Sequence, residues 1–261
     1  MVLAYAYSIV FAAPLRAEPS HRAEMVSQIL FGERVEIIEI NEEEWAQVRC
    51  EWDDYIGWCK AGQLDIVTRK EYIKVPKHIT YRHCDKIVFD NQEQMLPLGA
   101  ELFGLKGSKA LINNQQGKFK GKKKAVDELS PSTGGIIAAA LQFINAPYLW
   151  GGRTASGIDC SGLSQMAYKL CGMAISRDAS QQAQEGETVD FLLNAQGGDL
   201  AFFDNEAGNI THVGLLMDNQ QIIHATDTSG KVVVDRIDQG GIISKILRKR
   251  THNLRVIKRL F

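Results

Sequence analysis

The sequence predicts an α+β protein in which one or two small β-barrels precede a domain of helices packed on an antiparallel sheet. Short alternating runs separated by turns occupy residues 1–70, as in small barrels. Two compact helical patterns follow residue 130, and several short strand patterns follow the helices. The chain has 261 residues, 45% of them hydrophobic and 23% charged, which is ordinary for a globular protein and enough for a sizeable core.

The charge balance and the hydropathy of the chain exclude two classes of partner. Lys and Arg number 30 against 31 Asp and Glu, a formal net charge of −1, whereas nucleic-acid binders usually carry a basic footprint. No apolar run approaches the roughly 18–20 residues that span a bilayer. We therefore expect no nucleic-acid partner and no membrane partner, and the sequence does not indicate the oligomeric state.

The cysteines indicate a reducing compartment. Their count is odd and no Cys-x-x-Cys occurs, whereas a secreted disulfide framework normally uses an even number. We expect reduced thiols and a cytoplasmic protein. The alternative is an exported protein, because residues 1–19 are apolar enough to suggest a signal peptide. That segment has no Lys or Arg before Arg16, so we favour a first β-strand between Tyr5 and Phe11.

Residues 1–70 are predicted to form the first barrel. The run Glu33–Ile40 alternates and is rich in β-branched residues, and Trp45–Cys50 follows it after an acidic turn. Tyr55–Cys59 is the next predicted strand. The polar segment 15–28 is predicted to be a long loop.

Residues 71–126 are predicted to form a second barrel, complete or degenerate, with a linker. Its predicted strands are His78–Arg82, Lys86–Phe89 and Leu96–Leu102. The basic run Lys118–Lys124 is predicted to be a solvated loop, with a phosphate or anion site as the alternative.

Residues 127–261 are predicted to form the α+β domain. Ile136–Ile144 is a compact apolar helix after a Ser-Pro-Ser start signal, and a second helix follows Asp159 and ends near Gly172. Apolar residues share one face of that second helix, namely Leu163, Met166, Ala167 and Leu170. The predicted strands are Asp199–Phe203, Val213–Met217, Gln221–Ala225 and Lys231–Asp235.

Cys160 is the candidate nucleophile. It stands at or near the first turn of the second helix, where unpaired N–H groups and a partial positive charge favour a thiolate. The thiolate is the reactive form of cysteine. The other cysteines are expected to be inert packing residues.

His212 and His224 are the candidate imidazoles that a nucleophilic cysteine needs. A hairpin with a three-residue turn centred on Asp218 would place them directly opposite each other on one sheet face. His212 can then be the base and His224 can orient it, as the Asp does in a Ser-His-Asp triad. Two structural histidines or a metal pair are the alternatives. The metal pair lacks a third ligand at suitable spacing, so we expect no metal and no cofactor.

Four segments together resemble the NlpC-type papain-like cysteine peptidases, which cleave peptides of the bacterial cell wall. They are Tyr148–Gly152 (YLWGG), Asp159–Leu163 (DCSGL), Gly198–Phe203 (GDLAFF) and His212–Leu215 (HVGL). The resemblance covers about residues 130–226 and is specific as a set, although DCSG alone would be weak. It implies a papain-like fold for the C-terminal domain.

Tyr55–Trp58 (YIGW) resembles the closing strand of a bacterial SH3-like barrel, and one branch of the family joins such barrels to the peptidase. That branch consists of γ-D-glutamyl-L-diamino acid endopeptidases, which require a free N-terminal L-Ala. The resemblance implies a freed murein tri- or tetrapeptide, L-Ala-γ-D-Glu-diamino acid, as substrate, and a role in recycling. It does not distinguish diaminopimelate from lysine.

The resemblance also implies residue roles. Cys160 would be the nucleophile, His212 the base, His224 the third member, and Tyr148 would lie near the oxyanion. The implied substrate-binding residues are Tyr55, Trp150, Asp159, Ser161, Arg177, Asp178 and Glu24.

Asp178 would bind the L-Ala ammonium, with Tyr55 and Glu24 of the first barrel closing that end. One departure is Ala179, where the branch often has Ser, and this puts one hydrogen bond to substrate in doubt. Asp178 could instead cap a helix, and Tyr55 and Trp150 could be core aromatics. Another acidic residue of the barrel could replace Glu24.

Two rival functions remain open at this point. The first is a non-catalytic module that binds wall peptides, and the presence of Cys160, His212 and His224 together argues against it. The second is an amidase or acyltransferase on the same scaffold, which would keep these residues but have no use for Asp178.

Overall fold

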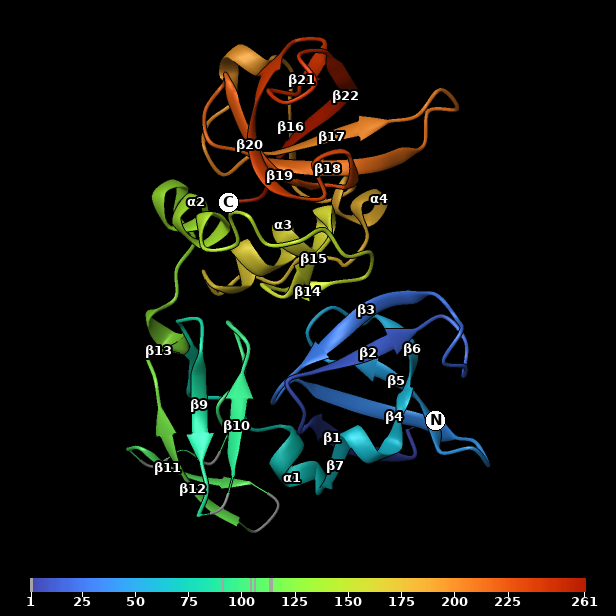
Figure 1. The fold of residues 1–261 in the computed structure, drawn as a ribbon, viewed down its shortest axis with the longest axis vertical. Helices are drawn as coiled ribbons and strands as arrows, with labels where there is room; N and C mark the ends of the chain where they lie inside the picture. Colours follow the sequence, from blue (N-terminus) through green and yellow to red (C-terminus); the bar gives the residue numbers. More distant parts are fainter. Residues whose placement is uncertain (1, 91, 104, 106, 113–114) are drawn as a thin grey trace. The chain divides into compact units, whose positions relative to one another are not determined.

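The computed structural model divides the chain into two compact units, Met1–Leu129 and Ser130–Phe261 (Figure 1). The sequence placed the start of the last domain at residue 127. The structure describes residues 2–90, 92–103, 105, 107–112 and 115–261.

The first part of unit 1 is a seven-stranded antiparallel sheet with the order β3-β2-β6-β5-β4-β1-β7. Alternate residues of its strands point into one core, such as Val35 and Ile37 of β4 and Val48 of β5. The elements are β1 (Ala4–Ser8), β2 (Ala12–Arg16), β3 (Met25–Leu30), β4 (Arg34–Ile40), β5 (Trp45–Cys50), β6 (Ile56–Lys60), η1 (Ala61–Gln63), β7 (Leu64–Val67) and α1 (Arg69–Tyr72).

The alternating runs predicted most of these strands. The strand at Trp45–Cys50 is confirmed with the same bounds, and the opening apolar segment forms β1 and β2. The predicted long loop at 15–28 is wrong, because β2 pairs with β3 across it and only the residues between Arg16 and Met25 connect them. Leu15 and Ile29 are fully buried there, but the polar residues around them hid the strands from the sequence pattern.

The second part of unit 1 contains a four-stranded sheet, order β10-β9-β12-β11, and a two-stranded sheet of β13 and β8. Phe31, which follows β3, packs in one buried cluster with Ile87 and Phe119, so the two parts of the unit share a core. The elements are β8 (His78–Thr80), β9 (Asp85–Val88), β10 (Glu93–Leu96), β11 (Lys109–Ile112), β12 (Gln115–Lys120), β13 (Lys123–Ala125) and η2 (Val126–Glu128).

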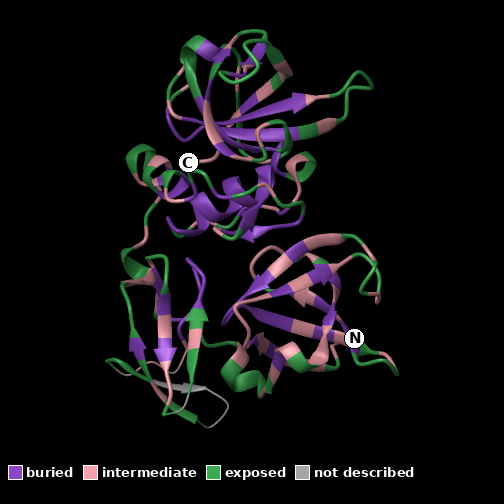
Figure 2. Ribbon diagram, in the orientation of Figure 1, coloured by how far each residue is buried: buried purple, intermediate pink, exposed green. Residues whose placement is uncertain are grey.

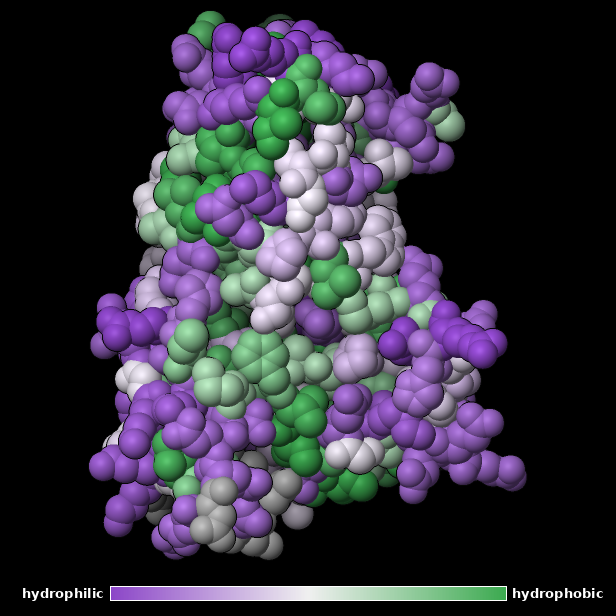
Figure 3. Space-filling model, in the orientation of Figure 1, coloured by the Kyte–Doolittle hydropathy of each residue, from purple (hydrophilic) through white to green (hydrophobic). Residues whose placement is uncertain are grey.

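Two predictions for this part are wrong. The predicted strand Leu96–Leu102 is only the end of β10, because Pro97 lacks a backbone N–H and Gly99 turns the chain with a positive φ of 82°. The basic run 118–124 is not a loop, because it comprises the end of β12, the two residues 121–122 and the start of β13. Its lysines are nevertheless largely exposed, and hydrophilic side chains gather over this part of the surface (Figure 3).

Unit 2 packs three helices against a seven-stranded antiparallel sheet with the order β16-β22-β17-β18-β19-β20-β21. Strand β21 also pairs with β22, which closes six of the strands into a ring. The elements are α2 (Thr133–Leu141), β14 (Arg153–Thr154), β15 (Gly157–Ile158), α3 (Cys160–Lys169), α4 (Ala179–Gln182), β16 (Glu187–Val189), η3 (Leu192–Asn194), β17 (Leu200–Asp204), β18 (Ile210–Leu216), β19 (Gln221–Thr226), η4 (Asp227–Ser229), β20 (Lys231–Asp238), β21 (Gly241–Ile243) and β22 (Arg250–Arg259).

The helices begin and end where their capping residues predict. Ser132 accepts a hydrogen bond from the Gly135 N–H at the start of α2. Gly172, in the left-handed conformation with φ of 81°, follows the end of α3. Every residue of α3 is buried, and the helix packs against α2, β18 and β19 (Figure 2). Within the described part of the chain, no helix is long and apolar enough to cross a membrane.

The four strands predicted from the series of short runs are confirmed as β17 to β20, with ends that coincide or are shifted by at most three residues. Strand β22 was not predicted. Its sequence, RTHNLRVIKR, carries charged residues on the exposed face and buries only Ile257 fully, so its hydrophobic pattern is weak.

Candidate active site

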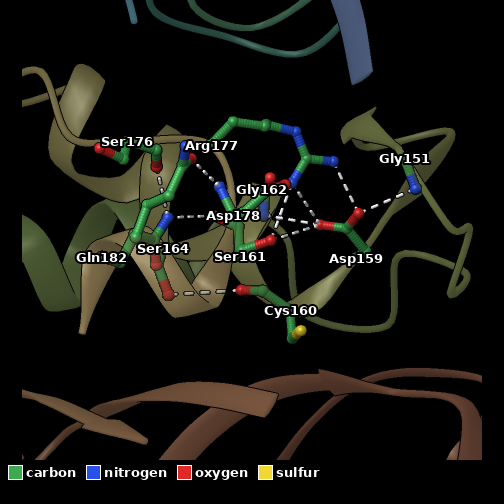
Figure 4. Close-up of polar contacts among 11 residues, drawn as sticks. Gly151, Asp159, Cys160, Ser161, Gly162, Ser164, Ser176, Arg177, Asp178 and Gln182 are labelled. Carbon is green, nitrogen blue, oxygen red and sulfur yellow. Dashed lines mark hydrogen bonds and ion pairs between the residues drawn. The ribbon is translucent and has the colours of Figure 1, made fainter. Parts of the chain in front are cut away.

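Cys160 is the first residue of α3, and Asp159 caps that helix. The Asp159 Oδ1 accepts the Gly162 N–H at 2.7 Å, and its carbonyl accepts the Leu163 N–H at 2.9 Å. The N–H groups of Cys160 and Ser161 come before these in the first turn, where α-helices carry amides with no intrahelical partner. Figure 4 shows the sulfur pointing away from Arg177, toward the ribbon of the sheet.

Burial decides the resting state of the thiol. It raises the pKa of Cys160 to about 12, and the charge of Asp159 acts in the same direction. The backbone N–H groups of Val213 and Ser161 and the charge of Arg177 favour the thiolate, as expected at a helix start, but they do not outweigh burial. Cys160 therefore rests as a thiol and needs a base to become a nucleophile.

His212 of β18 and His224 of β19 are hydrogen-bonded, with 2.8 Å between His212 Nε2 and His224 Nδ1. Their predicted position directly opposite each other is wrong. Leu215 pairs with Ile223 and Leu216 with Ile222, a register that places Gly214 opposite His224.

The turn explains the shift of register. It runs from Met217 to Gln221, and Asp218 Oδ1 accepts the N–H groups of Gln220 and Gln221 at 2.7 and 2.8 Å. A Cβ atom at Gly214 would lie 3.1 Å from the Cβ of His224 and 2.5 Å from a methyl carbon of Ile222. The absence of a side chain at Gly214 leaves space for the His224 ring to reach His212 diagonally across the hairpin.

The His212 ring is buried and packed on its face. His252 of β22 stacks on it with ring centroids 4.2 Å apart and an interplanar angle of 25°, and Phe203 lies 5.7 Å away. Burial, His224 and His252 lower the pKa of His212 well below its ordinary value, so the ring is neutral. Its Nε2 is engaged by His224, and Nδ1 is the nitrogen that can take the proton of the thiol.

Two residues of this cluster were missed by sequence reasoning. Asp235 Oδ2 lies 3.3 Å from His224 Nε2, and His252 stacks on His212. Asp235 ends the predicted strand 231–235, and its side-chain direction depended on the register with β19. His252 lies on β22, which was not predicted. Among the described residues, no group of three or more His, Cys, Asp or Glu side chains is arranged to hold a metal ion.

Arg177 forms a buried, bidentate ion pair with Asp159, the N-cap residue of α3. Its Nη2 lies 2.6 Å from Asp159 Oδ2 and its Nη1 3.1 Å from Oδ1, with side chains 1% and 7% exposed. Arg177 Nη1 also donates to Ser161 Oγ at 2.8 Å, and Gly151 N–H donates to Asp159 at 2.8 Å (Figure 4). These three side chains therefore hold one another and fix the start of α3. Their implied contacts with substrate stay predictions.

Tyr148 lies close to Cys160. It forms a parallel bridge with Ile158, just before the helix cap, and is half-buried. Burial raises the pKa of Tyr148, and the negative charge of Asp159 acts in the same direction, so the phenol keeps its proton and can donate a hydrogen bond. The implied oxyanion role stays a prediction. Trp150 is 57% exposed, so it is not a core aromatic.

Asp178 occupies the N-cap position of α4 and is half-buried. Its own N–H donates to Gln181 Oε1 at 3.3 Å. The helix-cap alternative is therefore right for its position, and the substrate contact stays a prediction. In unit 1, Tyr55 precedes β6 and packs on the barrel core, while Glu24 is exposed before β3. Their roles toward substrate also stay predictions.

The chain resembles known proteins in both units. Residues 145–251 match the model of the NlpC/P60 family, and residues 15–64 match that of the bacterial dipeptidyl-peptidase Sh3 domain. A dipeptidyl-peptidase 6 of Lysinibacillus sphaericus is 30% identical over 260 residues, which cover 88% of this chain and 91% of that protein. The chain belongs to the NlpC/P60 family. A gamma-D-glutamyl-L-lysine dipeptidyl-peptidase of Bacillus subtilis is 31% identical, covering 80% of this chain and 74% of its own.

Solved structures of NlpC/P60 proteins share the fold. A family member from Bacillus cereus has a TM-score of 0.81 at 19% identity and covers 98% of this chain and 99% of its own. An NlpC/P60 endopeptidase from Photobacterium damselae has a TM-score of 0.72 at 16% identity, covering 97% of this chain and 70% of its own. The expected papain-like domain with an N-terminal SH3-like barrel is thereby confirmed, and the chain is a cysteine peptidase rather than a binding module.

The buried histidines of the NlpC/P60 unit predict a loss of stability in mild acid. Burial, with His224, lowers the pKa of His252 to about 4, whereas an unfolded histidine titrates near 6.5. As pH falls through 6.5, the unfolded chain binds a proton that the folded chain excludes, so the free energy of unfolding falls until about pH 4. Urea unfolding at several pH values measures this. The His252→Phe variant keeps an aromatic ring and should lose less stability between pH 7 and 4.5; an unchanged loss would contradict the assignment.

Proposed function

We propose that this peptidase hydrolyses the bond between γ-D-Glu and the L-diamino acid of murein peptides. The observation that carries the proposal is the buried Cys160 at the start of α3 together with the hydrogen-bonded pair of His212 and His224, in a chain that aligns over 80% of its length with a relative named gamma-D-glutamyl-L-lysine dipeptidyl-peptidase. A second relative of that name, from Bacillus cereus, is 25% identical over 87% of this chain.

Cys160, His212 and His224 together support a two-step acyl transfer. His212 Nδ1 takes the thiol proton, and the Cys160 sulfur attacks the γ-carbonyl carbon of D-Glu. N–H groups at the start of α3 and the Tyr148 hydroxyl stabilise the oxyanion, an effect of about 3–4 kcal/mol per donor in comparable enzymes. His212 gives its proton to the departing amine of the diamino acid. Water then attacks the thioester, gives a proton to His212, and the sulfur leaves and recovers that proton.

Asp178 supports recognition of a free peptide N-terminus. It follows Arg177, whose side chain binds the cap of the catalytic helix, and its negative charge acts on that arginine. A carboxylate there suits the ammonium of L-Ala. In intact wall strands L-Ala is amide-linked to muramic acid and carries no charge. We therefore infer a role in recycling peptides that have been freed from the wall. The reduced, thiol form of all five cysteines suits the cytoplasm.

Blocking the substrate amine should slow hydrolysis. We expect kcat/KM for N-acetylated L-Ala-γ-D-Glu-diaminopimelate to be about 10- to 100-fold below that of the free tripeptide, because a hydrogen bond to a charged group contributes roughly 1.5–3 kcal/mol. Asp178 is half-buried rather than fully desolvated, so a larger effect is not expected. Mass spectrometry of the products measures both rates and identifies the bond that is cut.

Variants separate this reading from its rivals. Asp178→Asn should slow the free peptide and bring the two rates together, while Asp190→Asn, at an exposed position on the same unit, should leave their ratio unchanged. Equal rates on the two peptides in the native enzyme would discard the recognition of the amine and the recycling role. Transfer or deamidation products without cleavage at γ-D-Glu would favour the acyltransferase or amidase. The same assay with lysine in place of diaminopimelate gives the preferred diamino acid.

A further inference from the structure

A buried carboxylate stands behind the second histidine of the site. Asp235 is 3% exposed, and its Oδ2 lies 3.3 Å from His224 Nε2. Its other oxygen, Oδ1, accepts the backbone N–H of Lys245 at 2.8 Å. His224 pairs with Val233 across β19 and β20, and Asp235 lies two residues further along the same face. Both oxygens of this carboxylate are therefore held by the fold, one by the main chain and one by the imidazole.

The contacts define which nitrogen of each ring carries hydrogen. An ionised carboxylate only accepts hydrogen bonds, so His224 Nε2 must be the N–H of that ring, and its Nδ1 is the acceptor. That Nδ1 lies 2.8 Å from His212 Nε2, which must then be the N–H of the second ring. His212 Nδ1 is left with a lone pair, as a base for the thiol requires.

Charge acts in the same direction as geometry. Burial alone would raise the pKa of Asp235, but the hydrogen bonds from His224 and from the Lys245 N–H outweigh burial, and the pKa is lowered. The charge of Lys245, on the loop after β21, also lowers the pKa of Asp235, and the Asp235 carboxylate in turn acts on His252 of β22, which is neutral. The carboxylate stays ionised, and its negative charge favours the imidazolium that forms when His212 takes the thiol proton.

We propose that Asp235 is a positioning residue that sets the tautomer of both histidines and thereby makes His212 Nδ1 the base. The site then comprises four residues: the nucleophile Cys160, the base His212, the orienting His224 and the positioning residue Asp235. The proposal rests on the peptidase mechanism but not on the choice of peptide, because the tautomers exist without substrate.

Asp235→Asn tests the proposal, because the amide NH2 can donate to His224 Nε2 and invert both tautomers. We expect kcat to fall by roughly 10⁴-fold, as it does when Asn replaces the Asp of a Ser-His-Asp triad and imposes the wrong tautomer, with KM within about twofold. Asp238→Asn is the matched control. It removes a carboxylate from the same strand, three residues away and bound to Arg250 instead, and kcat should be unchanged.

Two readouts separate positioning from a merely structural role. Nitrogen-15 NMR of the native enzyme should show both histidines protonated at Nε2, and Asp235→Asn should move the proton to Nδ1 in both. In a His224→Ala background, Asp235→Asn should cost less than threefold in kcat. A native His224 protonated at Nδ1, or an undiminished loss in that background, overturns the proposal. If the Asn variant does not fold, the native spectrum and Asp235→Glu, which keeps the acceptor and should keep the tautomers, decide it.

Discussion

Replacing Cys160 with serine is expected to lower kcat for the free tripeptide by roughly 10⁶-fold, as loss of the nucleophile does in comparable enzymes. The structure gives a specific reason why serine cannot substitute. His212 is buried and its pKa is well below the ordinary value, so it is a weak base. Proton transfer to that base is already difficult from a thiol whose pKa is about 12. It is far more difficult from the alcohol of serine.

The measurement is steady-state turnover followed by mass spectrometry, with folding checked by circular dichroism. Cys171→Ser is the matched control, because Cys171 is also a buried thiol but follows the end of the same helix instead of beginning it. It should retain turnover within a few-fold. Substantial turnover by the Cys160→Ser enzyme would refute the nucleophile. Simple alkylation is less informative, since Cys84 is exposed and Cys160 is not.

Replacing Arg177 with alanine is expected to destabilise unit 2 by about 3–5 kcal/mol, because it leaves the buried Asp159 carboxylate without its charged partner. In a unit of this size the melting temperature should fall by on the order of 10–20 °C. Activity should fall as well at temperatures where the fold persists, since Asp159 caps the helix that carries Cys160.

Arg250→Ala provides the control for this ion pair. Arg250 also forms a bidentate ion pair, in which its Nη1 lies 2.6 Å from Asp238 Oδ1 and its Nη2 lies 3.0 Å from Asp238 Oδ2. The side chains of this pair, however, are 39% and 47% exposed. An ion pair as exposed as this one contributes little to stability, so the melting temperature should barely change. Calorimetry of both variants measures the difference. Equal, small shifts would mean that the Arg177 pair does not hold the helix start.

The secondary structure was predictable where the hydrophobic period was complete. Strands β4 and β5 alternate over most of their length, and α3 has both its cap and its apolar face in the sequence. Strands β2 and β3 were hidden by the polar residues around them, and β22 by its charged outer face. Burial by neighbouring strands, rather than local pattern, makes these segments strands.

The site was predictable in part for the same reason. Cys160 and the two histidines stand in local motifs, but the register of the hairpin depends on the geometry of the turn at Asp218, which composition does not give. Asp235 and His252 reach the site only because β20 lies beside β19 and β22 beside β17. Such pairings between distant segments leave no mark on any short stretch of sequence.

The place of β22 in the ring determines when the enzyme can become active. This strand follows every other strand in the sequence, yet it pairs with β16, β17 and β21 and carries the ring that stacks on His212. During synthesis from the N-terminus, unit 1 has all its strands long before residues 250–259 exist. The nucleophile, the base and its orienting histidine are also made first, but the sheet that holds them stays open. We therefore expect a ribosome-bound chain that lacks β22 to have an incomplete peptidase sheet, and hydrolysis to begin only once β22 has been made and has paired.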